Sequence, residues 1–147
     1  MSPEAGFRQS DSRWMGLDVG SKTIGVAITD PMKITARPLV TLDRRGLSAD
    51  CKAIRELACA QSVDKLIVGR PLHLDGRPSQ MLAAIEKLVD ELKRTSDLSI
   101  DWADERLSTK EAEALMVESG VDPRKHRARR NEFAAAVILR RYLEEER

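Results

Sequence analysis

The segment Met15 to Asp30, MGLDVGSKTIGVAITD, constrains the fold of this chain more than any other stretch. Two apolar runs flank Gly20-Ser21-Lys22, the pattern of a β-hairpin whose turn contains glycine. One acid, Asp18, lies inside the first apolar run. Because an unpaired carboxylate is costly to bury, the sequence predicts that Asp18 has a partner, which could be a cation, a hydrogen-bond donor or a metal ion.

The apolar patterns elsewhere predict an α/β fold. Strands are expected at residues 14–18, 24–29, 36–42, 65–69 and 98–103, and helices are expected to begin near Ser48, Pro78, Ser108 and Asn131. Three strands joined by short turns indicate an antiparallel meander, in which Pro38 favours an edge position for the third strand. The later strands alternate with helices, which indicates parallel crossovers. The order βββαβαβαα therefore predicts a mixed five-stranded sheet flanked by helices.

Local signals predict where the helices begin and end. Ser48 is expected to cap the first helix with its side chain. Ser108 and Glu111 have the spacing of a capping box for the third helix, which Gly120 is expected to end. The basic segment Arg124 to Arg130 is predicted to be a loop that precedes the last helix.

A length of 147 residues favours one domain with a substantial core. We expect the polar residues 1–13 to form a disordered tail and residues 14–147 to form the folded domain. Neither a signal peptide nor a membrane-spanning run is recognisable, which favours a soluble cytoplasmic protein. Cys51 and Cys59 are separated by about 12 Å of helical rise, too far for a disulfide, so both are expected to be buried thiols.

Two acids are placed to share a ligand. Asp18 lies late in the first strand and Glu105 follows the fifth strand, and ligands in open α/β sheets bind beyond the carboxyl ends of the strands. Neighbouring carboxylates repel each other unless a cation joins them, and hard oxygen ligands suit Mg²⁺ or Mn²⁺. The alternative is that Asp18 caps the glycine turn and Glu105 pairs with Arg106 or Lys110 on the surface.

Charge and aromatic content limit how the chain could bind nucleic acid. The net charge is only +1 and aromatic residues make up 3% of the chain, so any affinity must come from a local basic patch and not from base-stacking platforms. The segment Arg124 to Arg130 provides such a patch, and Arg70 and Arg77 could extend it. A solvated loop is the plainer interpretation, but a positive patch beside an acidic pocket also suits cleavage of phosphodiesters.

Four stretches of the chain resemble the four motifs of a known family. They are GLDVGSKTIGVA (Gly16 to Ala27), VGRPLHLDG (Val68 to Gly76), DERLST (Asp104 to Thr109) and AAAVIL (Ala134 to Leu139). In this order they resemble the YqgF family, whose ribonuclease H-like members are named as Holliday junction resolvases and as nucleases that mature the 5′ end of pre-16S rRNA. The likeness runs from about Trp14 to Leu143.

The resemblance implies a ribonuclease H-like fold whose acids bind one or two Mg²⁺ or Mn²⁺ ions. Asp18 and Glu105 match the first two acids, and the position of the third acid, which opens the last helix in the family, is Asn131 here. Asn131 offers a carbonyl oxygen without charge, so it should hold a cation more weakly. Glu132 is adjacent, but one residue along a helix turns the side chain by about 100°. His73 also departs from the family pattern, which has asparagine there.

Two functional hypotheses follow, with a third of a different class. In the first, Asp18, Glu105 and Asn131 hold the metal of an endonuclease that acts on precursor rRNA in preference to a DNA junction. The residues expected to hold the nucleic-acid backbone are Lys22, Arg70, Arg124, Lys125, Arg127, Arg129 and Arg130. In the second, the loss of an acid at Asn131 leaves a weakly catalytic or non-catalytic protein that binds rRNA or a ribosome precursor.

The third hypothesis is that the DxGxxxxG pattern of the opening hairpin forms a phosphate loop, because it also resembles that of actin-like ATPases and sugar kinases. Those proteins need two such domains to close on a nucleotide, and 147 residues provide one. The sequence leaves open whether the protein is a monomer or a homodimer.

Overall fold

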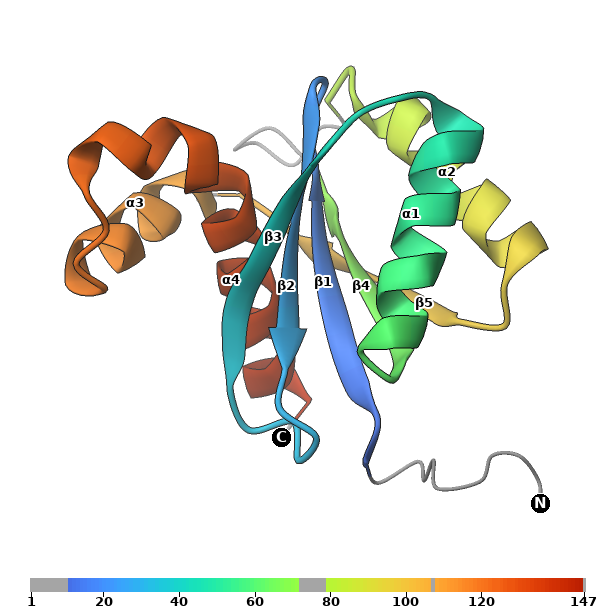
Figure 1. The fold of residues 1–147 in the computed structure, drawn as a ribbon, viewed down its shortest axis with the longest axis horizontal. Helices are drawn as coiled ribbons and strands as arrows, with labels where there is room; N and C mark the ends of the chain where they lie inside the picture. Colours follow the sequence, from blue (N-terminus) through green and yellow to red (C-terminus); the bar gives the residue numbers. More distant parts are fainter. Residues whose placement is uncertain (1–10, 72–78, 107, 147) are drawn as a thin grey trace.

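The computed structural model describes residues 11–71, 79–106 and 108–146. Its strands are β1 (Arg13–Val19), β2 (Thr23–Thr29), β3 (Ala36–Asp43), β4 (Val63–Arg70) and β5 (Ser99–Asp104). Its helices are α1 (Leu47–Ala60), α2 (Leu82–Thr95), α3 (Ser108–Glu118) and α4 (His126–Glu145), and the short 3-10 helix η2 (Pro123–Lys125) precedes α4. Figure 1 shows α1 and α2 on one face of the sheet and α4, flanked by α3, on the other.

The strands form one sheet in the order β3-β2-β1-β4-β5. The pairs β1–β2 and β2–β3 are antiparallel, whereas β1–β4 and β4–β5 are parallel. This arrangement confirms the mixed five-stranded sheet that the sequence predicts. Pro38 lies on β3, an edge strand, close to an irregularity in the β2–β3 register.

Each face of the sheet has its own apolar core. On the side of α1 and α2, β1 contributes Met15, Leu17 and Val19 to a cluster that includes Ile54 and Leu88. On the other side, Ala27 and Ile67 pack against alanine and leucine side chains of α4. The alternation of side chains along β1 separates the two cores. Residues 15, 17 and 19 therefore face α1 and α2, and residues 16 and 18 face α4.

Glycines in β1 and β2 let α4 lie directly on the sheet. A Cβ atom at Gly16 would lie 3.0 Å from the carbonyl oxygen of Ala135, and one at Gly25 would lie 2.0 Å from the carbonyl group of Asn131. The second distance is far below van der Waals contact, so no other residue fits at position 25 without movement of the helix. The small residues of the hairpin thus determine where α4 sits.

The last helix begins earlier than the sequence analysis predicts. Residues 126–130 form the start of α4 and residues 123–125 form η2, so the expected basic loop is mostly helical. The cause is a capping signal that precedes the basic run. The Asp122 side chain accepts a hydrogen bond from the backbone N–H of Arg124, and Pro123 occupies the first turn. Asn131 therefore lies within α4 and does not open it.

The predicted cap of the first helix is wrong. Helix α1 begins at Leu47 after Gly46, which has a φ of 123°, and Ser48 lies inside the helix. Ser108 is the first residue of α3, and the carboxylate of Glu111 pairs with Arg141. Gly120, with a φ of 74°, follows α3 as expected. Pro78 lies outside the described residues.

The domain begins earlier than residue 14. Arg13 opens β1, and the buried Ser12 donates a hydrogen bond to Asp64 at 2.9 Å, so these two residues belong to the fold and not to the expected tail. Residues 1–10 of that tail lie outside the described residues. Both cysteines are free, but only Cys51 is buried, since Cys59 is exposed. None of the described helices has the length and apolarity needed to cross a bilayer.

Candidate metal and nucleic-acid site

The sheet brings Asp18 and Glu105 together on the face that α4 covers. Asp18 shares this face with Gly16, whose Cα hydrogen faces Ala135 and Leu139 of α4. Glu105 follows β5 and lies beside Gly69, where a Cβ atom would meet Glu105 and Ile138 of α4. The parallel pairing of β1, β4 and β5 therefore places both acids at the carboxyl ends of parallel strands, on either side of β4.

The two carboxyl groups are half-buried and influence each other. Burial raises the pKa of Asp18 to about 6. Burial, followed by the negative charges of Asp18 and Asp104, raises the pKa of Glu105 to about 8. Both shifts have the direction expected for acids that are removed from water without a compensating positive charge. The pair therefore has a deficit of positive charge.

One oxygen of Glu105 has no hydrogen-bond partner in the described part of the chain. Its Oε1 atom is buried and unpaired among the described residues, and it would lie 2.8 Å from a Cβ atom at Gly69. The alternative considered above pairs Glu105 with Arg106 on the surface. The guanidinium of Arg106 instead binds Asp104, at 2.6 Å. A buried carboxylate oxygen without a donor calls for a ligand that the described residues do not provide.

Asn131 is the third residue at this place. Its backbone covers Gly25, which pairs with Asp18 across the β1–β2 ladder. Its side-chain Nδ2 donates a hydrogen bond of 2.6 Å to Oγ1 of Thr23. The amide nitrogen is thereby engaged, and Oδ1 is the atom of this side chain that can still accept a cation.

Glu132 does not take the place of the missing acid. It is buried, its Oε1 accepts a hydrogen bond of 3.0 Å from Oγ1 of Thr41, and its Oε2 lies 3.1 Å from Nη2 of Arg129. The carboxylate is therefore bound to β3 and to its own helix. Within the described ranges, no group of three histidine, cysteine, aspartate or glutamate side chains is arranged to hold a metal. Among the described residues near the acid pair, the amide oxygen of Asn131 is the candidate for a third ligand.

This donor set fits Mg²⁺ or Mn²⁺. Two carboxylates and one amide oxygen are hard ligands of the kind that these cations take, with water or substrate oxygens completing the coordination. A bound dication would pair with Oε1 of Glu105, which has no partner among the described residues, and would lower the raised pKa values of both acids. Asn131 supplies an oxygen but no charge, which reduces the electrostatic part of the affinity.

The predicted basic residues differ in how far they are already paired. Arg124 binds Asp122 at 2.8 Å, Arg129 binds Glu132, and Arg130 lies 3.4 Å from Glu113. By contrast, Lys125 and Arg127 are exposed and form no salt bridge with a described residue, and Lys22 on the β1–β2 turn is likewise exposed. The guanidinium of Arg70 lies 6.0 Å from the ring centroid of Trp102.

His126 does not contribute to the acid pair. His126 starts α4, and its Nε2 lies 3.0 Å from the carbonyl oxygen of Val121, which ties the helix to the preceding segment. His73 and Arg77 lie outside the described residues.

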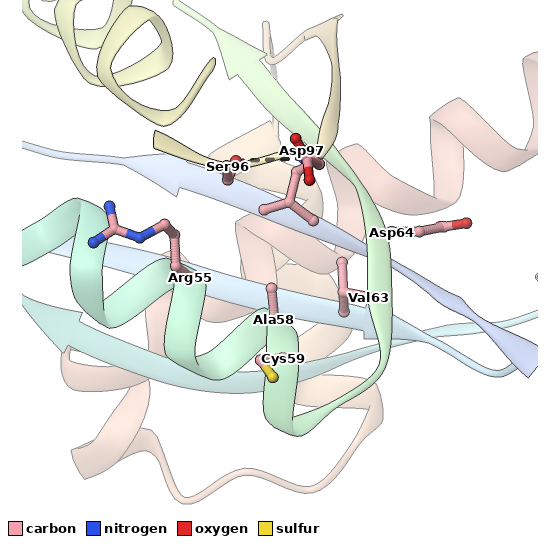
Figure 2. Close-up of a pocket in the computed structure, with 8 residues that line it drawn as sticks. Arg55, Ala58, Cys59, Val63, Asp64, Ser96 and Asp97 are labelled. Carbon is pink, nitrogen blue, oxygen red and sulfur yellow. Dashed lines mark hydrogen bonds between the residues drawn. The ribbon is translucent and has the colours of Figure 1, made fainter. Parts of the chain in front are cut away.

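Another part of the molecule contains a cavity of about 310 Å³, whose lining Figure 2 shows. Its lining includes Arg55 and Cys59 of α1, and Val63 at the start of β4. Asp18 and Glu105 lie at the other ends of the parallel strands, so this cavity is not part of the acidic site.

Comparison with known proteins identifies the family. The RuvX family, described as "Holliday junction resolvase", matches residues 12–145. This chain belongs to the RuvX family. A relative from Roseiflexus sp. (strain RS-1) is 38% identical over 135 residues, which cover 92% of this chain and 96% of that protein. A second, from Moorella thermoacetica, is 39% identical over 132 residues, covering 90% and 94% respectively. Both relatives carry the name "Putative pre-16S rRNA nuclease".

Solved structures confirm the fold expected for a RuvX protein. RuvC of T. thermophilus in complex with a Holliday junction substrate matches 92% of this chain and 95% of its own, with a TM-score of 0.60 and 13% identity. The fowlpox virus resolvase bound to junction DNA matches with a TM-score of 0.59 and 10% identity, covering 91% of this chain and 98% of its own. The family, the ribonuclease H-like fold and the nuclease class predicted from the four motifs are thus confirmed.

Sequence reasoning missed one polar residue of this RuvX site. Thr23 receives the amide of Asn131, although 108 positions separate the two residues. The available signal was its place at the end of the hairpin turn, three residues after Gly20, where a hydroxyl group is close to whatever packs on the hairpin. A periodicity argument assigns this residue only to the start of β2.

Proposed function

We propose that this protein is a metal-dependent endonuclease that processes the 5′ end of pre-16S rRNA. The observation that carries the proposal is the buried Oε1 of Glu105 beside Asp18, which has no hydrogen-bond partner among the described residues and to which a cation would bring the missing positive charge. Membership of the RuvX family supports nuclease chemistry, and the names of the Roseiflexus and Moorella relatives support the substrate.

Asp18, Glu105 and the Oδ1 atom of Asn131 would hold Mg²⁺ or Mn²⁺ in this proposal. A bound ion lowers the pKa of water and stabilises charge on the phosphate oxygens. Asp18 and Glu105 must lose their protons to act as ligands, and their raised pKa values mean that this loss is easier near neutral or alkaline pH than in acid. The apolar contacts of α4 with Gly16 and Gly69 limit access of water to one side of the acid pair.

The exposed cations would hold the nucleic-acid backbone. Lys22 lies on the turn between β1 and β2, close in sequence to both Asp18 and Thr23. Lys125 and Arg127 lie on η2 and the first turn of α4, the helix that also carries Asn131. Contacts of this kind position a phosphate backbone without reading its sequence, so cleavage specificity would depend on the shape of the RNA.

A cleavage panel tests this proposal. The substrates would be a precursor RNA with its 5′ extension, a plain duplex and a four-way DNA junction, each with Mg²⁺, Mn²⁺ or EDTA. We expect metal-dependent cleavage of the precursor RNA that is lost in Asp18→Asn and Glu105→Gln. The matched control is Asp90→Asn, which changes an exposed acid on α2. Equal cleavage by Asp18→Asn and the parent would contradict the metal site. Preferential cleavage of the junction would mean that the substrate is junction DNA and not precursor RNA.

A weakly catalytic rRNA-binding protein is the second candidate function. The observation that favours it is that no third acid joins the pair among the described residues, since Glu132 is bound to Thr41 and Arg129 and Asn131 is uncharged. The variant Asn131→Asp separates the two functions. A gain of tenfold or more in cleavage rate, about 1.4 kcal/mol, would mean that the amide limits the native site. An unchanged rate with tight binding of precursor RNA would indicate that the amide of Asn131 is an adequate ligand.

A further inference from the structure

The turn between β1 and β2 is held in place by several hydrogen bonds. Within the turn, the N–H of Gly20 donates to the carbonyl oxygen of Thr23 at 2.8 Å. From the segment after β3, Arg44 donates through Nη1 to the carbonyl oxygen of Gly20 at 2.7 Å, and through its backbone N–H to Lys22 at 2.9 Å. The backbone of the turn is therefore fixed from outside the hairpin as well as from within.

Arg44 is itself held by a buried acid. Its Nε lies 2.8 Å from Oδ2 of Asp50, whose side chain is 2% exposed. The other oxygen of Asp50 accepts a hydrogen bond from the backbone N–H of Arg45 at 2.8 Å. This pairing restricts the guanidinium of Arg44 to one position, so the donor to the Gly20 carbonyl oxygen is itself held in place.

Thr23 stands at the end of this fixed turn and contacts Asn131. The hydrogen bond between Nδ2 of Asn131 and Oγ1 of Thr23 is 2.6 Å long. Gly20 contributes space, because a Cβ atom there would lie 3.2 Å from the same Nδ2 atom. Since nitrogen and oxygen flank the same carbon of an amide, holding the nitrogen also determines the direction of Oδ1.

We propose that Thr23 is a positioning residue for Asn131, whose amide it orients so that Oδ1 is ready to accept a cation. This inference rests on the proposed function, because it assigns the cation site to Asp18, Glu105 and Asn131. An uncharged ligand gains less from a cation than a carboxylate does, so it depends more on being oriented in advance. The hydroxyl of Thr23 supplies that orientation from a turn that Arg44 keeps fixed.

The test compares Thr23→Val, which keeps the shape without the hydroxyl, with Thr23→Ser, which keeps the hydroxyl. The matched control is Thr41→Val, because Thr41 binds the next residue of α4, Glu132, and not Asn131. The first readout is the side-chain amide resonance pair of Asn131 in the metal-free protein, assigned by its absence in Asn131→Asp. We expect this pair to shift in Thr23→Val and to stay near its parent position in Thr23→Ser and Thr41→Val.

The second readout is the affinity for Mn²⁺, measured by calorimetry. Loss of one hydrogen bond that orients a ligand should weaken binding about fivefold in Thr23→Val, with recovery in Thr23→Ser. An unchanged Asn131 resonance, or parent-like Mn²⁺ affinity in Thr23→Val, would overturn the positioning role. If the parent binds no Mn²⁺ in a manner that depends on Asp18, the proposed function fails, and the resonance comparison alone then decides whether Thr23 orients the amide.

Discussion

Two sets of acids in this molecule are withdrawn from water in opposite ways. Asp50 is 3% exposed, and both of its oxygens are bonded, one to the guanidinium of Arg44 and one to the N–H of Arg45. Asp18 and Glu105 are also withdrawn from solvent, yet each faces the other, and Oε1 of Glu105 has no partner in the described parts of the chain. An acid whose partners belong to the protein stabilises the fold, whereas an acid pair without them favours an external cation.

The largest effect is expected from Asp18→Asn. It should reduce metal-dependent cleavage by roughly a hundredfold or more, since even groups that only orient metal ligands contribute on the order of 10–100-fold. In the metal-free protein the same change should raise the unfolding temperature, because it removes a half-buried charge beside Glu105. Cleavage assays and calorimetry measure the two quantities. If Asp18→Asn lowered the metal-free stability as well as the activity, the contrast between this acid pair and Asp50 would be contradicted.

The same substitution at Asp50 should act in the opposite sense on stability. Asp50→Asn leaves the guanidinium of Arg44 without its counter-charge, while the amide oxygen can still accept from the N–H of Arg45. We expect a loss of about 2 kcal/mol in the free energy of unfolding, as for other hydrogen bonds between charged groups. Urea denaturation at neutral pH measures this loss. A variant as stable as the parent would show that the Arg44–Asp50 pair is dispensable.

The acid pair should also make stability depend on pH. In the folded protein Asp18 and Glu105 keep their protons up to pH values of about 6 and about 8, above their ordinary values of 3.8 and 4.5. The native state thus binds more protons than the unfolded state in this window, and its stability should fall as the pH rises from about 4 to about 8.

Mg²⁺ should counteract that fall by binding the deprotonated native state, and Glu105→Gln should make the pH profile flatter. Unfolding free energies measured across this window, with and without Mg²⁺, provide the check. A metal-free protein that becomes more stable between pH 5 and pH 8 would contradict the raised pKa values.

The smallest expected effect extends the comparison of paired and unpaired charges to basic side chains. Arg127 has no salt bridge to a described residue, whereas Arg124, three residues earlier, binds Asp122 at 2.8 Å. Arg127→Gln should reduce the salt dependence of RNA binding by about one phosphate contact, a change of roughly 0.7 in the log–log slope for single strands. Arg124→Gln should change the slope less. Fluorescence anisotropy at several salt concentrations distinguishes the two, and equal slopes would mean that pairing with Asp122 does not matter.

The sequence predicted the sheet and the acid pair because both follow from local patterns. Alternating apolar residues define the strands, and the strand order then determines where an acid at the end of a strand lies. Asp18 and Glu105 could therefore be assigned to one end of the sheet from chain order alone.

Long-range side-chain contacts could not be predicted in the same way. Glu132 is bound by Thr41, 91 positions away, and Asn131 by Thr23, 108 positions away. No periodicity encodes such pairs, because they depend on how α4 is rotated on the sheet. The early start of α4 is different, since the Asp122–Pro123 pair is a local capping signal that the basic run after it obscured.

The contact between Gly25 and the backbone of Asn131 has a consequence for how this site could vary. Because the helix rests on the strand through main-chain atoms at this point, the location of residue 131 does not depend on which side chain it carries. An exchange between amide and carboxylate here would alter the charge of the site by one unit while the scaffold stayed the same. If the proposed metal site is correct, single substitutions at position 131 would adjust its affinity independently of the architecture that surrounds it.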